Sequence, residues 1–136
     1  MFKLDSRLQQ DTFDMGRFSL CRLLLLNDSR YTWFVLVPER EDITEIHQLS
    51  AAERALFWDE SHRLSVWMTT AFAFDKLNLA ALGNVVSQLH LHHVGRRVGD
   101  PAWPGPVWGH SPAVSYAEAV VNDIRQLVQR DLLAAP

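Results

Sequence analysis

Two histidines, His90 and His92, occupy alternate positions in the apolar segment from Gln88 to His93. Successive side chains of a strand point to opposite faces, so both imidazoles and the Gln88 amide are predicted to share one face, about 6.5 to 7 Å apart. The leucines between them and His93 are predicted to share the other face. Neutral imidazole is a good nucleophile near neutral pH, and covalent catalysis divides a difficult displacement into two easier steps. The segment therefore predicts a chemical site on one face of a strand.

Two other interpretations of this pair remain open. Both histidines can be hydrogen-bonded core residues, because buried polar side chains in folded proteins are normally paired. They can also hold zinc or another transition ion together with one further ligand. The local sequence places no carboxylate, cysteine or third histidine beside them. We therefore expect no metal and no other cofactor, and we expect His93 to serve in packing.

Four apolar segments are predicted as strands. Residues 18–26 and 31–37 are aliphatic or aromatic, and the polar residues 27–30 between them are typical of a hairpin loop. Residues 72–79 predict a third strand, and the histidine segment, about 83–96, predicts the fourth. Residues 1–17 have a weaker pattern, typical of a short helix or an edge strand.

Two helices complete the predicted fold. Ser50 and Glu53 have the spacing of a capping box, as do Ser115 and Glu118, and each pair marks a helix start. The predicted apolar face of the first, long helix consists of Ala52, Leu56, Leu64, Trp67, Met68 and Ala71. The second helix is expected over about 116–133. The fold class is therefore α+β, with an antiparallel sheet of about four to five strands, one long helix packed on it and a C-terminal helix.

The composition limits the class of protein. The 136 residues are 48% hydrophobic, which suits one domain over residues 1–136. The formal charge of −3 is spread over mixed side chains, so a nucleic-acid partner is not expected. No apolar run approaches the roughly 20 residues that span a bilayer, so no membrane partner is expected. Cys21 is the single cysteine, and the first residues lack the apolar core of a signal peptide, which favours a cytoplasmic location.

A proline-rich segment follows the histidines. Residues 100–110 contain three prolines and two glycines, which excludes a helix or a central strand and predicts an ordered loop. Its tryptophans, Trp103 and Trp108, are expected to anchor the loop by packing, and they can also wall a pocket. His47, His62 and His110 lie in helical or loop sequence and are assigned no function.

The histidine segment resembles the signature of the histidine triad (HIT) superfamily of nucleotide hydrolases and transferases, in which single apolar residues separate three histidines. Aligning the chain through Gly83-Asn84 and Gly95-Arg96 puts Gln88 at the first histidine, His90 at the middle one and His92 at the third. The first histidine is thus replaced. The resemblance implies a HIT-like sheet with a core of about residues 18–110.

A second segment carries the same resemblance. Thr32-Trp33-Phe34, which leads to Pro38, looks like the Thr-His-Phe strand of the family, with Trp33 in place of that histidine. Trp33 and Gln88 can therefore be a joint replacement of two family histidines.

The resemblance also implies roles for the aligned residues. The middle histidine of the family attacks the α-phosphate of a nucleotide, so His90 is the predicted nucleophile. His92 would donate a hydrogen bond to phosphate oxygens, and Gln88, which cannot titrate, would position the phosphate or His90. The remaining substrate-binding candidates are Asn27 or Asp28 for the ribose, and Asn78, Gly83, Asn84 and Arg96 for the phosphate side.

The predicted function is therefore hydrolysis or transfer of a nucleoside monophosphate from a phosphoanhydride or a phosphoramidate, through a nucleotidyl-histidine intermediate. The partner would be a small-molecule nucleotide, with a purine base expected, and the family resemblance also implies a homodimer. A nucleotide-binding module without turnover is the alternative that the missing first histidine raises. A histidine-ligated metal protein is a further alternative.

Overall fold

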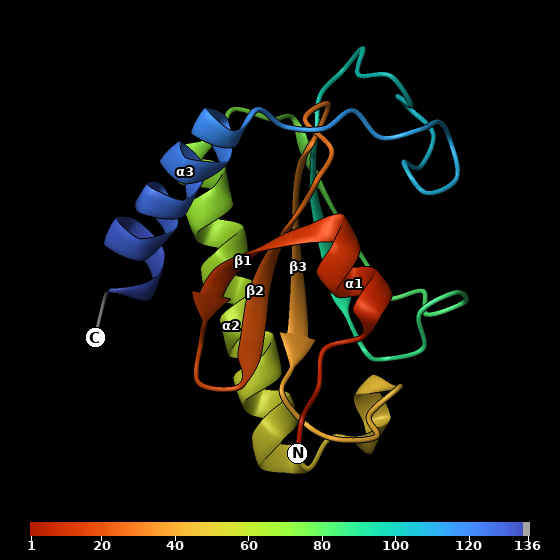
Figure 1. Cartoon of the computed structure of the whole chain (residues 1–136), viewed down its shortest axis with the longest axis vertical. Coiled ribbons are helices and arrows are strands. Elements are labelled where there is room, and N and C mark those ends of the chain that lie inside the picture. The colour runs from red at the N-terminus through yellow and green to blue at the C-terminus, as the bar shows by residue number, and fades with distance from the viewer. Residues whose placement is uncertain (135–136) are drawn as a thin grey trace.

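A five-stranded antiparallel sheet, in the order β1-β2-β3-β5-β4, forms the centre of the computed structural model, which describes residues 1–134 (Figure 1). The strands are β1 (Thr12–Arg17), β2 (Cys21–Leu26), β3 (Thr32–Pro38), β4 (Lys76–Ala80) and β5 (Leu91–Arg96). The predicted hairpin is confirmed, because β2 and β3 pair antiparallel across residues 27–31. The α+β fold is also confirmed.

The helices are α1 (Ser6–Asp11), α2 (Ala51–Ala71) and α3 (Glu118–Leu127), with a short 3-10 turn η1 (Ile46–Gln48) and a π-helical turn η2 (Val128–Leu133). The first predicted capping box is confirmed: Ser50 Oγ accepts the amide of Glu53, and the Glu53 carboxylate accepts the amide of Ser50. The second is wrong, because the N-cap of α3 is Ala117, which has no side-chain cap.

The buried face of α2 differs in part from the predicted one. Leu64, Trp67 and Met68 are buried as predicted, whereas Ala52, Leu56 and Ala71 are exposed. The rest of the buried face is Phe57, Glu60 and Ser61. Glu60 accepts the amides of Leu20 at 2.9 Å and Cys21 at 2.8 Å, and the Ser61 hydroxyl bonds His93 of β5 at 2.8 Å. These two polar residues of α2 fix the rotation of the helix against the sheet. A count of apolar residues alone misses this.

Two predicted strands are shorter than expected. The third begins at Lys76 rather than at residue 72, because its pairing with β5 starts with Lys76 opposite Arg96. The histidine strand, β5, begins at Leu91, where its pairing with Leu36 of β3 starts, so His90 lies directly before the strand. The N-terminal segment supplies α1 and the edge strand β1.

Each face of the sheet has its own cover. In Figure 1, α2 passes behind the strands and α1 lies in front of them. The α2 side carries a core cluster that includes Phe34, Leu64 and Leu91. The other side carries a second cluster, built from the N-terminal segment, β2, β3, β5 and the loop after β5, that includes Leu4, Leu8, Trp33, Val35, Val94 and Val107. No helix within residues 1–134 is long and apolar enough to cross a membrane.

Candidate active site

His90 is held by the backbone two residues before it. The imidazole is 7% exposed, and its Nδ1 lies 2.7 Å from the carbonyl oxygen of Gln88. A carbonyl oxygen only accepts, so Nδ1 carries the hydrogen. In the neutral ring the lone pair therefore resides on Nε2, the atom that a nucleophilic histidine needs.

His92 has the opposite tautomer. Its Nδ1 lies 2.9 Å from Nε1 of Trp33, and an indole N–H only donates. Nδ1 of His92 is therefore the acceptor, and its Nε2 carries the hydrogen. Burial, followed by the neighbouring charges of His90 and His93, lowers the pKa of His92 to about 3. At neutral pH this ring is an uncharged hydrogen-bond donor.

The two rings lie against each other with aromatic neighbours. The centroids of His90 and His92 are 4.8 Å apart, at an interplanar angle of 69°. Trp33 meets the His92 ring at 5.7 Å and Trp108 meets it at 5.4 Å, both edge to face. Trp108 comes from the proline-rich loop, whose predicted irregular and anchored structure is confirmed. The pair is thus rigidly packed, with one acceptor nitrogen and one donor nitrogen.

The Gln88 side chain binds a distant segment. Its Oε1 accepts the amide of Asp5 at 2.9 Å, and its Nε2 donates to the carbonyl of Lys3, also at 2.9 Å. Its own carbonyl receives the His90 hydrogen bond. The Gln88 side chain therefore holds the N-terminal segment, and its backbone carbonyl holds the His90 ring.

His90 opens onto a small recess. The recess has a volume of about 20 Å³, and Gly83, Ser87 and Gln88 are among its walls. It shares Glu45, Ala81 and Leu89 with a wider groove of about 670 Å³, which His47 and Arg54 also line. Gly83 has a φ of 77°, which lets the chain turn beside His90. Asn84, the next predicted residue, is exposed and is not part of this lining.

Arg96 and Asn78 bind each other. The Arg96 guanidinium is 1% exposed, forms a two-point pair with Asp100 at 2.8 and 2.9 Å, and donates to Asn78 Oδ1 at 3.0 Å. It also lies over the rings of Tyr31 and Trp103. The Arg96 hydrogen bonds lower the pKa of Asp100 to about 2. Arg96 is not solvent facing, and its contacts anchor the loop after β5.

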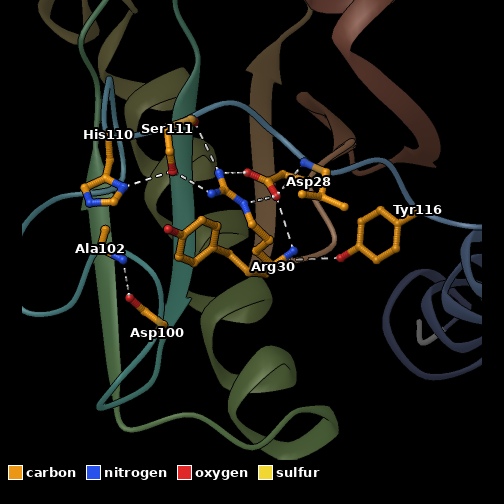
Figure 2. Close-up of polar contacts among 9 residues, drawn as sticks. Asp28, Arg30, Asp100, Ala102, His110, Ser111 and Tyr116 are labelled. Atoms are coloured by element: carbon orange, nitrogen blue, oxygen red, sulfur yellow. Dashed lines mark hydrogen bonds and ion pairs between the residues drawn. The ribbon is translucent and has the colours of Figure 1, made fainter.

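The two ribose candidates hold the segment before α3. Figure 2 shows Asp28 facing Arg30, whose guanidinium donates to both Asp28 oxygens at 3.0 and 2.9 Å and to Ser111. Burial tends to raise the pKa of Asp28, but these bonds, together with backbone amides, lower it on balance. Asn27 Oδ1 accepts the amide of Tyr116 at 2.9 Å. Both side chains thus have intramolecular partners.

His93 lies on the opposite face, as predicted. It is fully buried, its Nδ1 donates to the carbonyl of Leu91 at 3.1 Å, and its Nε2 accepts the Ser61 hydroxyl at 2.8 Å. Burial lowers its pKa to about 4, against a smaller opposing effect of the Leu91 bond. His47, His62 and His110 are exposed.

Sequence reasoning missed three contacts of the site. The sequence predicts that Trp108 packs or walls a pocket but does not identify His92 as its partner, and it assigns no role to the backbones of Lys3 and Asp5. The loop composition is a signal for Trp108, whereas backbone atoms of a distant segment leave no signal in the sequence. Within residues 1–134, no group of three or more His, Cys, Asp or Glu side chains could hold a metal ion.

Comparison with known proteins gives consistent results. A family model described as HIT domain matches residues 7–99. A histidine triad protein of Marinobacter aquaeolei VT8 is 46% identical with a TM-score of 0.94, covering 97% of this chain and 96% of that one. Those of Bradyrhizobium japonicum (40%, TM-score 0.93, 96% and 98% covered) and Sinorhizobium meliloti 1021 (39%, TM-score 0.93, 96% and 97% covered) are also similar. No curated protein sequence matches.

Proposed function

The chain belongs to the HIT family, and from this premise we propose that it hydrolyses or transfers a nucleoside monophosphate from a phosphoanhydride or a phosphoramidate. One observation carries the proposal. The hydrogen bond from Nδ1 of His90 to the Gln88 carbonyl leaves the lone pair on Nε2, which lies in a ring that lines the recess. A nucleophile needs such a free, oriented nitrogen.

The proposed reaction has two displacements. Nε2 of His90 attacks the α-phosphorus, a P–N bond forms, and the bond to the leaving group breaks with its electron pair on the departing oxygen, or on the departing nitrogen, which takes up a proton from solvent and leaves as an amine. Water then attacks the same phosphorus, the P–N bond breaks and its electron pair returns to Nε2, which restores the neutral ring, while the proton of the attacking water passes to solvent. His92 donates its Nε2–H to a non-bridging oxygen, where negative charge grows in the transition state.

The leaving group would extend from the recess into the wider groove. That groove carries an apolar floor of Ile46, Ala81 and Leu89, with Arg54 and His47 beside it. The amide side of the Gly83 turn would lie next to the phosphate, where backbone donors suit an anion. The contacts of these four candidates support a different role: Asn78 and Arg96 anchor the loop after β5, and Asn27 and Asp28 hold the segment before α3.

A nucleotide-binding module without turnover is the second candidate. The observation that favours it is the tight cover of the site: both histidines are less than a tenth exposed, and the recess at His90 measures about 20 Å³. A nucleotide would have to enlarge this recess on binding. Binding without product release is the behaviour that this candidate predicts.

The test is monophosphate release from diadenosine polyphosphates, nucleoside phosphoramidates and nucleotide sugars, with and without chelator. We expect turnover that survives the chelator and falls by about a thousandfold or more in a folded His90→Ala variant, because the covalent route is lost. A single turnover should also leave the nucleotide on His90, visible by mass spectrometry after acid-free quenching. Nucleotide binding without release from any substrate would favour the binding module, and turnover that persists in His90→Ala would reject His90 as the nucleophile.

A further inference from the structure

We propose that Gln88 is a positioning residue that clamps the N-terminal segment to the backbone that orients His90. The clamp consists of the Gln88 side-chain amide, the Lys3 carbonyl and the Asp5 amide. This inference rests on the proposed function, since the residue it positions is the proposed nucleophile. It assigns to the residue at the first triad position a structural role in place of proton transfer.

Gln88 forms bonds in two directions. Its side chain pairs with Lys3 and Asp5, each at 2.9 Å and more than 80 residues away in sequence. Its main-chain carbonyl accepts Nδ1–H of His90 at 2.7 Å. Residue 88 is not in the β-ladder, because β5 begins at Leu91. The side-chain contacts therefore supply a restraint that strand pairing does not give to this carbonyl.

The N-terminal segment is itself anchored on the site face. Leu4 lies between the two clamped backbone groups and is 9% exposed, and Leu8 of α1 is 6% exposed. Both belong to the cluster that contains Trp33, the donor that sets the tautomer of His92. The Asp5 carboxylate caps α1 by accepting the Arg7 amide at 2.8 Å. The clamp thus joins a packed segment to the backbone carbonyl that orients His90.

A glutamine suits this position for a chemical reason. The clamp needs one acceptor, for the Asp5 amide, and one donor, for the Lys3 carbonyl. A carboxamide offers both at every physiological pH. An imidazole offers one donor and one acceptor only when it is neutral. When it is protonated, both nitrogens are donors, and the Asp5 N–H would face a donor in place of its acceptor. Gln88 therefore makes the clamp independent of pH.

The experiment combines Gln88→Ala with removal of residues 1–5, which deletes both the Lys3 carbonyl and the Asp5 amide. In the full chain, Gln88→Ala removes both bonds and should speed hydrogen exchange at the Asp5 amide by about tenfold. It should also lower the population of His90 with its hydrogen on Nδ1, which ¹⁵N NMR measures. We expect kcat to fall by roughly five- to tenfold, with KM changed less. In the truncated chain the same substitution should change kcat by less than about twofold, because its partners are gone. Gln10→Ala, an exposed glutamine of α1, is the matched control.

Two conservative variants refine the test. Gln88→Glu keeps the acceptor for Asp5 but loses the donor to Lys3, so it should restore only part of kcat. Gln88→His should add an acidic limb to the kcat profile, because protonation removes the acceptor. The inference would be overturned if Gln88→Ala lowered kcat equally in the full and truncated chains. It would also be overturned if the substitution speeded hydrogen exchange at Asp5 but left kcat and the His90 tautomer unchanged. If the wild-type chain shows no turnover, the proposed function fails, whereas exchange and tautomer still decide the clamp.

Discussion

His90 and His93 have the same local hydrogen bond and opposite surroundings. In each, Nδ1 bonds the carbonyl two residues earlier, at 2.7 Å to Gln88 for His90 and at 3.1 Å to Leu91 for His93. The Nε2 atom of His93 is taken by the Ser61 hydroxyl of α2, while His90 faces a recess. The same backbone device therefore prepares a lone pair on both faces of the strand, and the partner of that lone pair decides whether it can serve in chemistry.

The largest expected effect separates these two histidines by stability. His93→Ala should lower the free energy of unfolding by about 3 kcal/mol, because it leaves a cavity and an unpaired Ser61 hydroxyl in the core. His90→Ala should lower it by a smaller amount, about 1 to 2 kcal/mol, because the ring is buried and hydrogen-bonded but lines a recess. Chemical denaturation of both variants measures the difference.

For activity, we expect the reverse order of effects, with His90→Ala more damaging than His93→Ala. At a temperature where both variants are folded, His93→Ala should retain monophosphate release within about threefold of the wild type, whereas His90→Ala should lose it. Similar losses of activity in the two variants would mean that the faces are not functionally distinct, and the comparison would fail.

The sequence predicts one side of this comparison better than the other. Strand alternation assigns His90 and His92 to one face and His93 to the other, because the period of a strand is a local property. The partners of these rings are not local. Ser61 faces His93 because Glu60 bonds the β1–β2 turn and sets the rotation of α2, and Gln88 finds its partners in backbone atoms of residues 3 and 5. Backbone groups are identical in every residue, so no pattern marks them.

The family resemblance predicts more of the site than hydrophobic periodicity does. The tertiary contacts then show which of the predicted side chains already have partners. The resemblance identified the family, which the HIT domain match shows, and it predicts His90 as the nucleophile. The resemblance predicts Asp28 and Arg96 as candidates for substrate binding. In the structure each already forms an ion pair, Asp28 with Arg30 and Arg96 with Asp100. Alignment transfers a position, whereas the availability of a side chain depends on all of its neighbours.

The next largest expected effect is a loss of folding stability at low pH, which a buried neutral histidine produces. Burial lowers the folded-state pKa of His93 to about 4 from its ordinary value of 6.5, so between these two pH values the unfolded chain binds the proton and the folded chain does not. Stability is therefore highest above pH 6.5 and falls as the pH drops toward 4. His93 should contribute roughly 2 kcal/mol to the loss between pH 8 and pH 5.

Denaturation curves at several pH values check this contribution. His93→Gln should reduce the slope of the free energy of unfolding against pH, between pH 6.5 and pH 4, by the contribution of one histidine. The contribution of His92, whose folded-state pKa is lowered to about 3, should remain. His62→Gln, at an exposed position of α2, is the control and should leave the slope unchanged. A slope that is the same in all three chains would contradict the assignment of acid sensitivity to the buried face.

The smallest effect concerns the two tryptophans that touch His92. Trp33→Phe keeps an aromatic ring but removes the N–H that Nδ1 of His92 accepts at 2.9 Å. His92 can then carry its hydrogen on Nδ1 in part of the population, which removes the donor from the phosphate side, so kcat/KM should fall by about tenfold. Trp108→Phe is the matched comparison, because the Trp108 indole N–H has no hydrogen-bond partner among residues 1–134 and only its ring meets His92. Its loss should cost less than about threefold, with the ¹⁵N tautomer signature of His92 unchanged. If both variants lose activity equally and neither alters the tautomer, packing rather than the hydrogen bond orients His92, and Trp33 would be a wall residue like Trp108.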